Sequence, residues 1–157
     1  MLPRLAVGVC GAVFRGHLLG PFCTCRPSVG HWRDQTKAGN AVDARIINTS
    51  SGAGLLGSVG QGNYAAAKAG IIGFTRALAH DLADDGITVN CVVPGLIGTP
   101  RPKDRPEPAH HLTHQTITGE RGRPDDVAAM VRFLCGPGAR YINGQAIHAN
   151  GGAYLGA

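Results

Sequence analysis

Short apolar runs bounded by glycine and proline flank one long amphipathic stretch in this chain. The run from Ala44 to Ser50 is rich in β-branched residues, and a second run, from Ile87 to Val93, stops at Pro94. Both patterns are typical of buried strands. Between them, apolar residues recur at helical spacing from Asn63 to Asp84. The order strand, helix, strand predicts two parallel strands joined by a right-handed crossover.

Two further elements follow in the last third of the chain. Pro124 opens an amphipathic pattern that stops at Gly136, which predicts a helix with proline in its first turn. The residues from Tyr141 to Asn150 predict a third strand. Between the second strand and this helix, the proline-rich residues 99–122 show little periodic hydrophobicity and are interpreted as a lid-like loop.

The segment from His17 to Lys37 has helix-forming patches, but it contains Pro21, Pro27 and Gly30. Proline in a helix interior removes a hydrogen bond and clashes with the preceding turn. We therefore expect a broken helix here. Together, these elements predict an α/β protein with a short parallel sheet of about three strands and flanking helices, a partial Rossmann-like three-layer fold.

Composition narrows the function classes. With 157 residues, of which 43% are hydrophobic, the chain is long enough for one domain with a real core. The net charge is +5, but the basic residues are scattered and lack interleaved aromatics, so a nucleic-acid partner is not favoured. The apolar run from Leu5 to Phe14 is too short to span a bilayer. Five cysteines without paired spacing indicate reduced thiols, and we expect a cytoplasmic protein.

A histidine cluster and a tyrosine–lysine pair are the first chemical candidates. His110, His111 and His114 have spacing suited to a metal, but a solvated loop is the favoured interpretation, and we expect no metal site. Tyr64 and Lys68 are four residues apart, so they share one face of the predicted helix. An ammonium about 4 Å from a phenolate stabilises it by about 4 kcal/mol at an effective dielectric near 20. Such a pair can serve as an acid/base group.

The residues from Arg45 to Ser51 and from Gly60 to Gly70 resemble the core of the short-chain dehydrogenase/reductase family. In that family a serine ends a strand, a tyrosine follows thirteen residues later and a lysine four beyond it. Ser51, Tyr64 and Lys68 have this spacing. The resemblance implies that Tyr64 exchanges a proton with the substrate oxygen and that Ser51 hydrogen-bonds this oxygen. It also implies that Lys68 favours the phenolate and holds the nicotinamide ribose.

The resemblance continues beyond the second strand. The run from Asn90 to Thr99 is similar to the family's Pro-Gly turn, which contacts the carboxamide end of the cofactor. This implies cofactor contacts at Pro94, Gly95, Ile97 and Thr99, beside those at Tyr64 and Lys68. The resemblance covers about residues 44–155 and implies NAD or NADP as cofactor, a small hydroxy or oxo substrate, and a homo-oligomer.

The family's first half carries a glycine-rich turn that binds the pyrophosphate at a helix N-terminus, and this turn is absent from the sequence. The literal match at Gly52, Gly54 and Gly57 is interpreted as a decoy, because no acidic residue ends a second strand about 20 residues later. We expect these glycines to shape the turn after Ser51. The residue that separates NAD from NADP is also absent, so the choice stays open.

The family usually has an asparagine that anchors a water in its early helix, and His17 falls at that place. A branch similar to peroxisomal-type 3-hydroxyacyl dehydrogenases carries histidine there. His17 is therefore a candidate for positioning a water, and an ordinary exposed histidine is the alternative. Residues 1–15 match nothing in the family, as a shifted reading frame or a misplaced start codon would produce.

Two functions follow from this combination. The first is an NAD(P)-dependent oxidoreductase that interconverts an alcohol and a ketone, with 3-hydroxyacyl or 3-oxoacyl compounds as candidate substrates. The second is a truncated, catalytically inactive fragment that acts at most as a structural or oligomer subunit, because the missing half would leave a sheet edge exposed. In both cases we expect a single truncated domain over residues 1–157.

Overall fold

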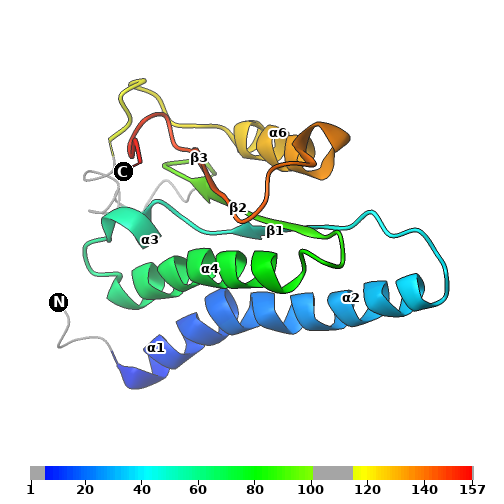
Figure 1. Ribbon diagram of the computed structural model, residues 1–157. Helices are drawn as coiled ribbons and strands as arrows, with labels where there is room; N and C mark the ends of the chain where they lie inside the picture. The colour runs from blue at the N-terminus through cyan, green and yellow to red at the C-terminus, as the bar shows by residue number, and fades with distance from the viewer. Residues whose placement is uncertain (1–5, 101–114, 157) are drawn as a thin grey trace.

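A three-stranded parallel sheet in the order β1-β2-β3 forms the centre of the molecule (Figure 1). The computed structural model describes residues 6–100 and 115–156. Its strands are β1 (Arg45–Thr49), β2 (Thr88–Pro94) and β3 (Ala146–Ala149). Because the strands are parallel, all three carboxyl ends lie at the same edge of the sheet. This edge is where α/β proteins of this kind place their ligands.

Helices cover both faces of the sheet. Helix α4 (Gly62–Asp81) packs on one face, and α6 (Pro124–Cys135), followed by the 3-10 turn η3 (Pro137–Ala139), packs on the other (Figure 1). A short helix, α3 (Ala53–Leu56), lies between β1 and α4. The arrangement confirms the predicted α/β fold with a short parallel sheet and flanking helices.

The middle strand shows why the apolar runs form this sheet. Five consecutive residues of β2, Val89–Val93, are buried, as expected for a parallel strand covered on both faces. Ile71 of α4 packs with Cys91 and Val93 on one face, while Leu134 of α6 packs with Val92 on the other. The alternation of β2 side chains between two separate apolar clusters fixes the register of the sheet.

The expected broken helix over His17–Lys37 is wrong. Helix α1 (Val7–Phe14), a π-helical turn η2 (Arg15–Leu19) and α2 (Gly20–Lys37) follow one another without interruption, and Pro27 lies inside α2. Pro21 directly follows the π-helical turn, and because Leu19 and Gly20 already have helical backbone angles, it lies inside the same continuous helical run. Cys25 and Val29 of α2 are buried against α4 and the sheet. This packing outweighs the local cost of Pro27, because tertiary burial routinely overrides helix propensity.

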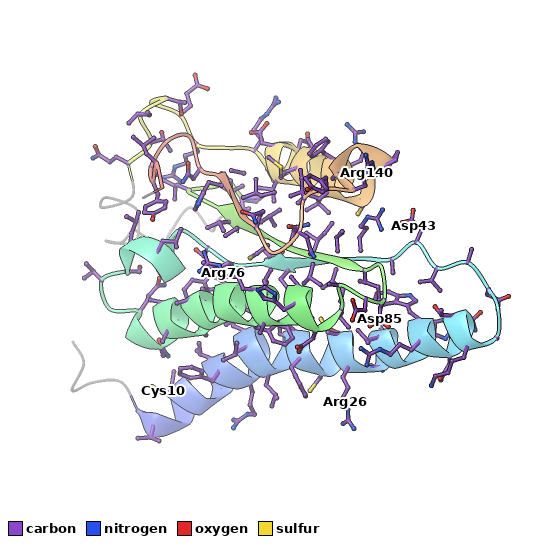
Figure 2. The ribbon with its side chains drawn as sticks, in the orientation of Figure 1. Cys10, Arg26, Asp43, Arg76, Asp85 and Arg140 are labelled. Carbon is purple, nitrogen blue, oxygen red and sulfur yellow. The ribbon has the colours of Figure 1, made fainter. Side chains whose placement is uncertain are left out.

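A long-range ion pair fixes α2 along α4. The Arg33 guanidinium donates to both oxygens of the Asp85 carboxylate at 2.7–3.1 Å, and Asp85 follows the end of α4. Figure 2 shows Asp85 beside α2, whereas Arg26 projects from the opposite side of that helix. Phe22 and Phe74 also meet across the two helices, with ring centroids 6.3 Å apart. Helix α2 therefore lies against α4 on the side away from α6.

The third strand is shorter than predicted. The expected strand over Tyr141–Asn150 forms only at Ala146–Ala149. Ahead of it, Gly144 adopts a φ of 70°, and the Asn143 side chain accepts a hydrogen bond from Val89 N. A side chain thus replaces the backbone partner that a longer strand would supply to Val89.

The predicted lid-like loop, residues 99–122, is described only at its two ends. Residues 101–114 lie outside the described residues. On either side of them, Ile97 pairs with Gly122 in an isolated parallel bridge. Across residues 6–100 and 115–156, no helix combines the length and apolar character of a membrane span.

Candidate active site

The carboxyl edge of the sheet brings three turns together. Gly52 N, in the turn after β1, donates to Pro94 O at 2.9 Å, and Gly95 N donates to Ala149 O at 3.0 Å. A Cβ added at Gly95 would lie 2.7 Å from Asn150, so only glycine allows this close approach. The Pro94–Gly95 turn therefore lies between the turn that carries Ser51 and the turn that follows β3.

Lys68 and Tyr64 lie on the first half of α4, beside these turns. The Lys68 side chain reaches back to the end of β1, where its ammonium donates to Thr49 O at 2.9 Å. The same Nζ lies 5.6 Å from the centroid of the Tyr64 ring. Lys68 is only 9% exposed, whereas Tyr64 is half-buried. Tyr64 and Lys68 therefore lie on the same face of α4, as their spacing of four residues predicts, and their side chains are close to each other.

The Lys68 ammonium is partly desolvated. Burial lowers the pKa of Lys68, because desolvation disfavours the ammonium, and the buried Cys91 thiol nearby opposes this effect. Burial also raises the pKa of the Cys91 thiol. An ammonium has three donors, and Thr49 O takes one of them. The other two donors have no hydrogen-bond partner among the described residues.

His17 reaches Tyr64 from the π-helical turn. The two rings meet edge to face, with centroids 5.1 Å apart and an interplanar angle of 89°. Single π-helical turns occur often at functional sites, because the extra residue redirects the side chains on one face. The structure therefore places both His17 and Lys68 next to the Tyr64 ring.

Ser51 lies in the turn between β1 and α3. Its hydroxyl oxygen accepts a hydrogen bond from Ala53 N at 3.3 Å. A hydroxyl that accepts in this way keeps its own proton for donation. Ser51 as a whole is half-buried.

The remaining predicted cofactor residues continue the Pro94–Gly95 turn. Thr99 N donates to Ile97 O at 3.1 Å, and Gly122 N donates to Leu96 O at 3.0 Å. These bonds hold the two described ends of the predicted lid beside the sheet edge. His110, His111 and His114 lie outside the described residues. In the part of the chain that the structure describes, no group of three or more His, Cys, Asp or Glu side chains is placed to hold a metal.

The sequence analysis missed two polar groups at the carboxyl edge of the sheet. Ser50 is 3% exposed and its hydroxyl donates to the backbone oxygen of Lys68 at 2.7 Å. Asn150 holds the turn after β3, since its side chain accepts from Gly152 N and donates to Tyr154 O. A polar residue at the end of an apolar strand was the available signal for Ser50, but its partner is eighteen residues away.

Comparison with known proteins decides the family. The family model described as enoyl-(acyl carrier protein) reductase matches residues 23–154. The chain belongs to the short-chain dehydrogenase/reductase family. This match includes α4 and the three turns at the carboxyl edge.

Curated relatives agree with this assignment. The 3-oxoacyl-(acyl-carrier-protein) reductase FabG of Vibrio cholerae is 46% identical over 112 residues, which are 71% of this chain and 46% of the relative. The acetoacetyl-CoA reductase of Shinella zoogloeoides is 41% identical over 146 residues, 92% of this chain and 58% of the relative. The chain therefore spans about half the length of the curated relatives it matches.

A solved structure shows the same fold. The 4-hydroxyisoleucine dehydrogenase complexed with NADH superposes with a TM-score of 0.83 at 24% sequence identity, over 98% of this chain and 63% of that protein. The partial Rossmann-type arrangement of sheet and helices is thus shared with a longer dehydrogenase.

Proposed function

We propose that this chain carries the catalytic site of an NAD(P)-dependent short-chain dehydrogenase/reductase, which interconverts an alcohol and a ketone. One observation carries the proposal: the Tyr64 ring, at the carboxyl edge of the sheet, lies 5.1 Å from the His17 ring and 5.6 Å from the Lys68 ammonium. Family membership supports the same chemistry.

In this proposal Tyr64 handles the proton. Among the described residues its hydroxyl has no hydrogen-bond partner, so it can turn to a substrate oxygen. In the reduction of a ketone, the phenol O–H bond breaks and the proton moves to the carbonyl oxygen, while Ser51 donates a hydrogen bond to the same oxygen. The neighbouring Lys68 ammonium stabilises the phenolate that remains.

We propose that the nicotinamide end of a cofactor binds at this edge. Lys68 has two donors without a partner among the described residues, which could bind ribose hydroxyls, and the turn from Pro94 to Thr99 supplies backbone groups at the same edge of the sheet. When bound, the cofactor supplies the hydride for reduction or accepts it in oxidation. NAD and NADP share this end of the molecule, so both are candidates.

The substrate class follows from the relatives. Two of them are named 3-oxoacyl-(acyl-carrier-protein) reductase and acetoacetyl-CoA reductase. We therefore propose a 3-oxoacyl or 3-hydroxyacyl thioester as the small-molecule substrate. The family resemblance, and not these names, is the basis on which we propose a homo-oligomer as the active assembly.

In the same site, His17 is proposed to hold a water that returns the proton to Tyr64. Its ring already contacts the Tyr64 ring, and imidazole can both accept and donate hydrogen bonds. A substitution of His17 by Phe keeps the ring contact and removes the nitrogen atoms. It should therefore lower turnover more than it lowers cofactor affinity.

Cofactor binding tests the proposal directly. Titration of the purified protein with NADH and with NADPH, followed by cofactor fluorescence, should give saturable binding. Lys68→Met should weaken this binding at least tenfold, because it removes the donors for the ribose, whereas Tyr64→Phe should bind within a few-fold of the wild type. A well-folded sample that binds neither cofactor contradicts the proposal.

The alternative function is a non-catalytic structural subunit. The outer edge of β1 favours it, since no strand of the described residues pairs with that edge, and exposed strand edges promote association with other chains. A folded protein that assembles with a partner or with itself, and fails the cofactor titration, would support this alternative.

A further inference from the structure

The end of β1 and the turn that follows it both hydrogen-bond to one residue of α4, Lys68. From one side, the Ser50 hydroxyl donates to the backbone oxygen of Lys68 at 2.7 Å. From the other end of the same residue, the ammonium donates to Thr49 O at 2.9 Å. Two consecutive residues of the chain thus hold both the backbone and the side chain of Lys68.

Gly54 adds a steric contact at the same place. A Cβ built on Gly54 would lie 2.8 Å from the carbonyl carbon of Lys68 and 2.8 Å from Ala69 N. Helix α3 therefore packs directly on the backbone of α4, without an intervening side chain. An alanine at this position would push the two helices apart.

The turn that makes these contacts is itself fixed to the sheet. Ser50 N donates to Val92 O and Gly52 N donates to Pro94 O, both at 2.9 Å. Ser51 lies between these two anchored residues. The position of Ser51 and the position of Lys68 are therefore set by the same few hydrogen bonds.

We propose that Ser50 and Gly54 are positioning residues, which fix the axial position of α4 and with it the places of Tyr64 and Lys68 relative to the turn that carries Ser51. Apolar contacts alone would not do this, because burial is not directional. A slide of α4 by a single residue moves every side chain by about 1.5 Å and rotates it by about 100°. Acid/base chemistry tolerates only much smaller displacements of the reacting groups. A misplacement of about 1 Å can lower turnover about 100-fold.

A second buried hydrogen bond between β1 and α4 supplies a matched control. The Asn48 side chain donates to Thr75 Oγ1 at 2.9 Å, and both residues are buried. This bond lies about two helical turns beyond Lys68. Thr75→Val therefore removes a comparable hydrogen bond between the same two elements. It leaves the bonds of Lys68 to Ser50 and Thr49 in place.

The first test needs neither cofactor nor turnover. Hydrogen exchange of the Lys68 ammonium, measured by nitrogen-15 NMR, reports how firmly Nζ is held at Thr49 O. Ser50→Ala should speed this exchange at least threefold, because α4 gains freedom to move. Thr75→Val should leave it within 1.5-fold of the wild type, and Ser50→Thr, which keeps the hydroxyl, should restore slow exchange.

Gly54→Ala is the second variant, in case Ser50→Ala does not fold. It should speed the exchange by a similar factor. Unchanged exchange in a folded Ser50→Ala or Gly54→Ala protein overturns the proposal. Equal acceleration in Thr75→Val also overturns it, because the effect would then be general loosening of α4.

The consequence for catalysis rests on the proposed function. In an active preparation, Ser50→Ala should lower kcat about tenfold or more and change KM less than twofold, because it misplaces the reacting groups without removing a binding contact. Absence of turnover in the wild type contradicts the proposed function alone, since the exchange measurement still decides the role of Ser50 and Gly54.

Discussion

At the scale of single residues, Lys68 is the side chain on which the site depends most. It is nearly fully buried, and its charge is balanced by a carbonyl oxygen rather than by a carboxylate. Retaining such a group costs stability, which is common at functional sites. Its position between β1 and the Tyr64 ring makes sense as part of a chemical site and is hard to explain as packing.

The first prediction concerns the pH dependence of stability. Burial lowers the pKa of Lys68 in the folded protein, so the unfolded chain binds more protons between that lowered value and the ordinary value of 10.5. The contribution of Lys68 to the free energy of unfolding should therefore become more favourable as the pH rises through this window. Lys68→Met should lose this rise.

Urea unfolding of wild type and Lys68→Met at pH 7 and pH 10 measures this effect. The exposed Lys37→Met serves as the control, because Lys37 makes only a surface pair with Asp34 at 3.6 Å. If the difference in free energy of unfolding between the wild type and Lys68→Met is the same at both pH values, Lys68 is not desolvated.

At the scale of elements, the long helix at the start of the chain was the main error of the sequence analysis. The apolar periodicity predicted β1, α4, β2 and α6, because in each of them the local pattern and the tertiary burial agree. Pro21, Pro27 and Gly30 argued against a continuous α2, and local propensity gave no way to weigh them against the burial of Cys25 and Val29. Long-range packing decided that element.

At the candidate site, too, the sequence predicted some features and not others. Ser51, Tyr64 and Lys68 were found through their spacing and the family resemblance, and His17 through its place in that resemblance. The sequence did not predict the bonds from Lys68 to Thr49 and Ser50, which join residues eighteen and nineteen positions apart. Such contacts depend on how α4 lies on the sheet, which the helical pattern alone does not determine.

Pro27→Ala is the second prediction. An interior proline costs a helix about 3 kcal/mol, while proline gains up to about 1 kcal/mol by restricting the unfolded chain. The substitution should therefore stabilise the protein by about 2 kcal/mol in chemical unfolding. A Pro27→Ala protein that is no more stable than the wild type would contradict this account of α2.

The ion pair between α2 and the end of α4 gives a third prediction. The hydrogen bond from Arg33 holds the pKa of Asp85 below its ordinary value of 3.8. Its stabilising contribution should therefore be complete above that value and disappear as the pH falls through the lowered pKa. Asp85→Asn should destabilise the protein at pH 7 and have little effect near pH 2.

Unfolding curves of Asp85→Asn at the two pH values, with Asp34→Asn as the surface control, measure this difference. Because the Arg33–Asp85 pair is partly exposed, with side chains 48% and 25% accessible, its contribution at pH 7 should also fall in high salt. If Asp85→Asn loses the same stability at both pH values, the loss comes from packing and not from charge.

At the scale of the whole molecule, the outer edge of β1 has no partner strand among the described residues. Ser50 N bonds to β2, so in this parallel pair Ile46 and Asn48 also face β2, while Ile47 and Thr49 direct their backbone groups outward. The curated relatives and the solved dehydrogenase are both longer than this chain.

Hydrogen exchange along β1 gives the fourth prediction. The amides of Ile46 and Asn48 should exchange slowly, and those of Ile47 and Thr49 should exchange at least tenfold faster in the isolated chain. Equal protection at all four positions would mean that another strand covers the outer edge, which a sedimentation measurement on the same sample would then detect as an oligomer.

The central claim, that this chain holds a working oxidoreductase site, is tested most directly by steady-state turnover. The assay follows oxidation of NADPH or NADH by the purified protein with acetoacetyl-CoA as the 3-oxoacyl substrate. The account predicts turnover that falls about 100-fold or more in Tyr64→Phe, as loss of a general acid requires. No turnover by a well-folded protein that binds cofactor, or equal turnover by Tyr64→Phe, would contradict it.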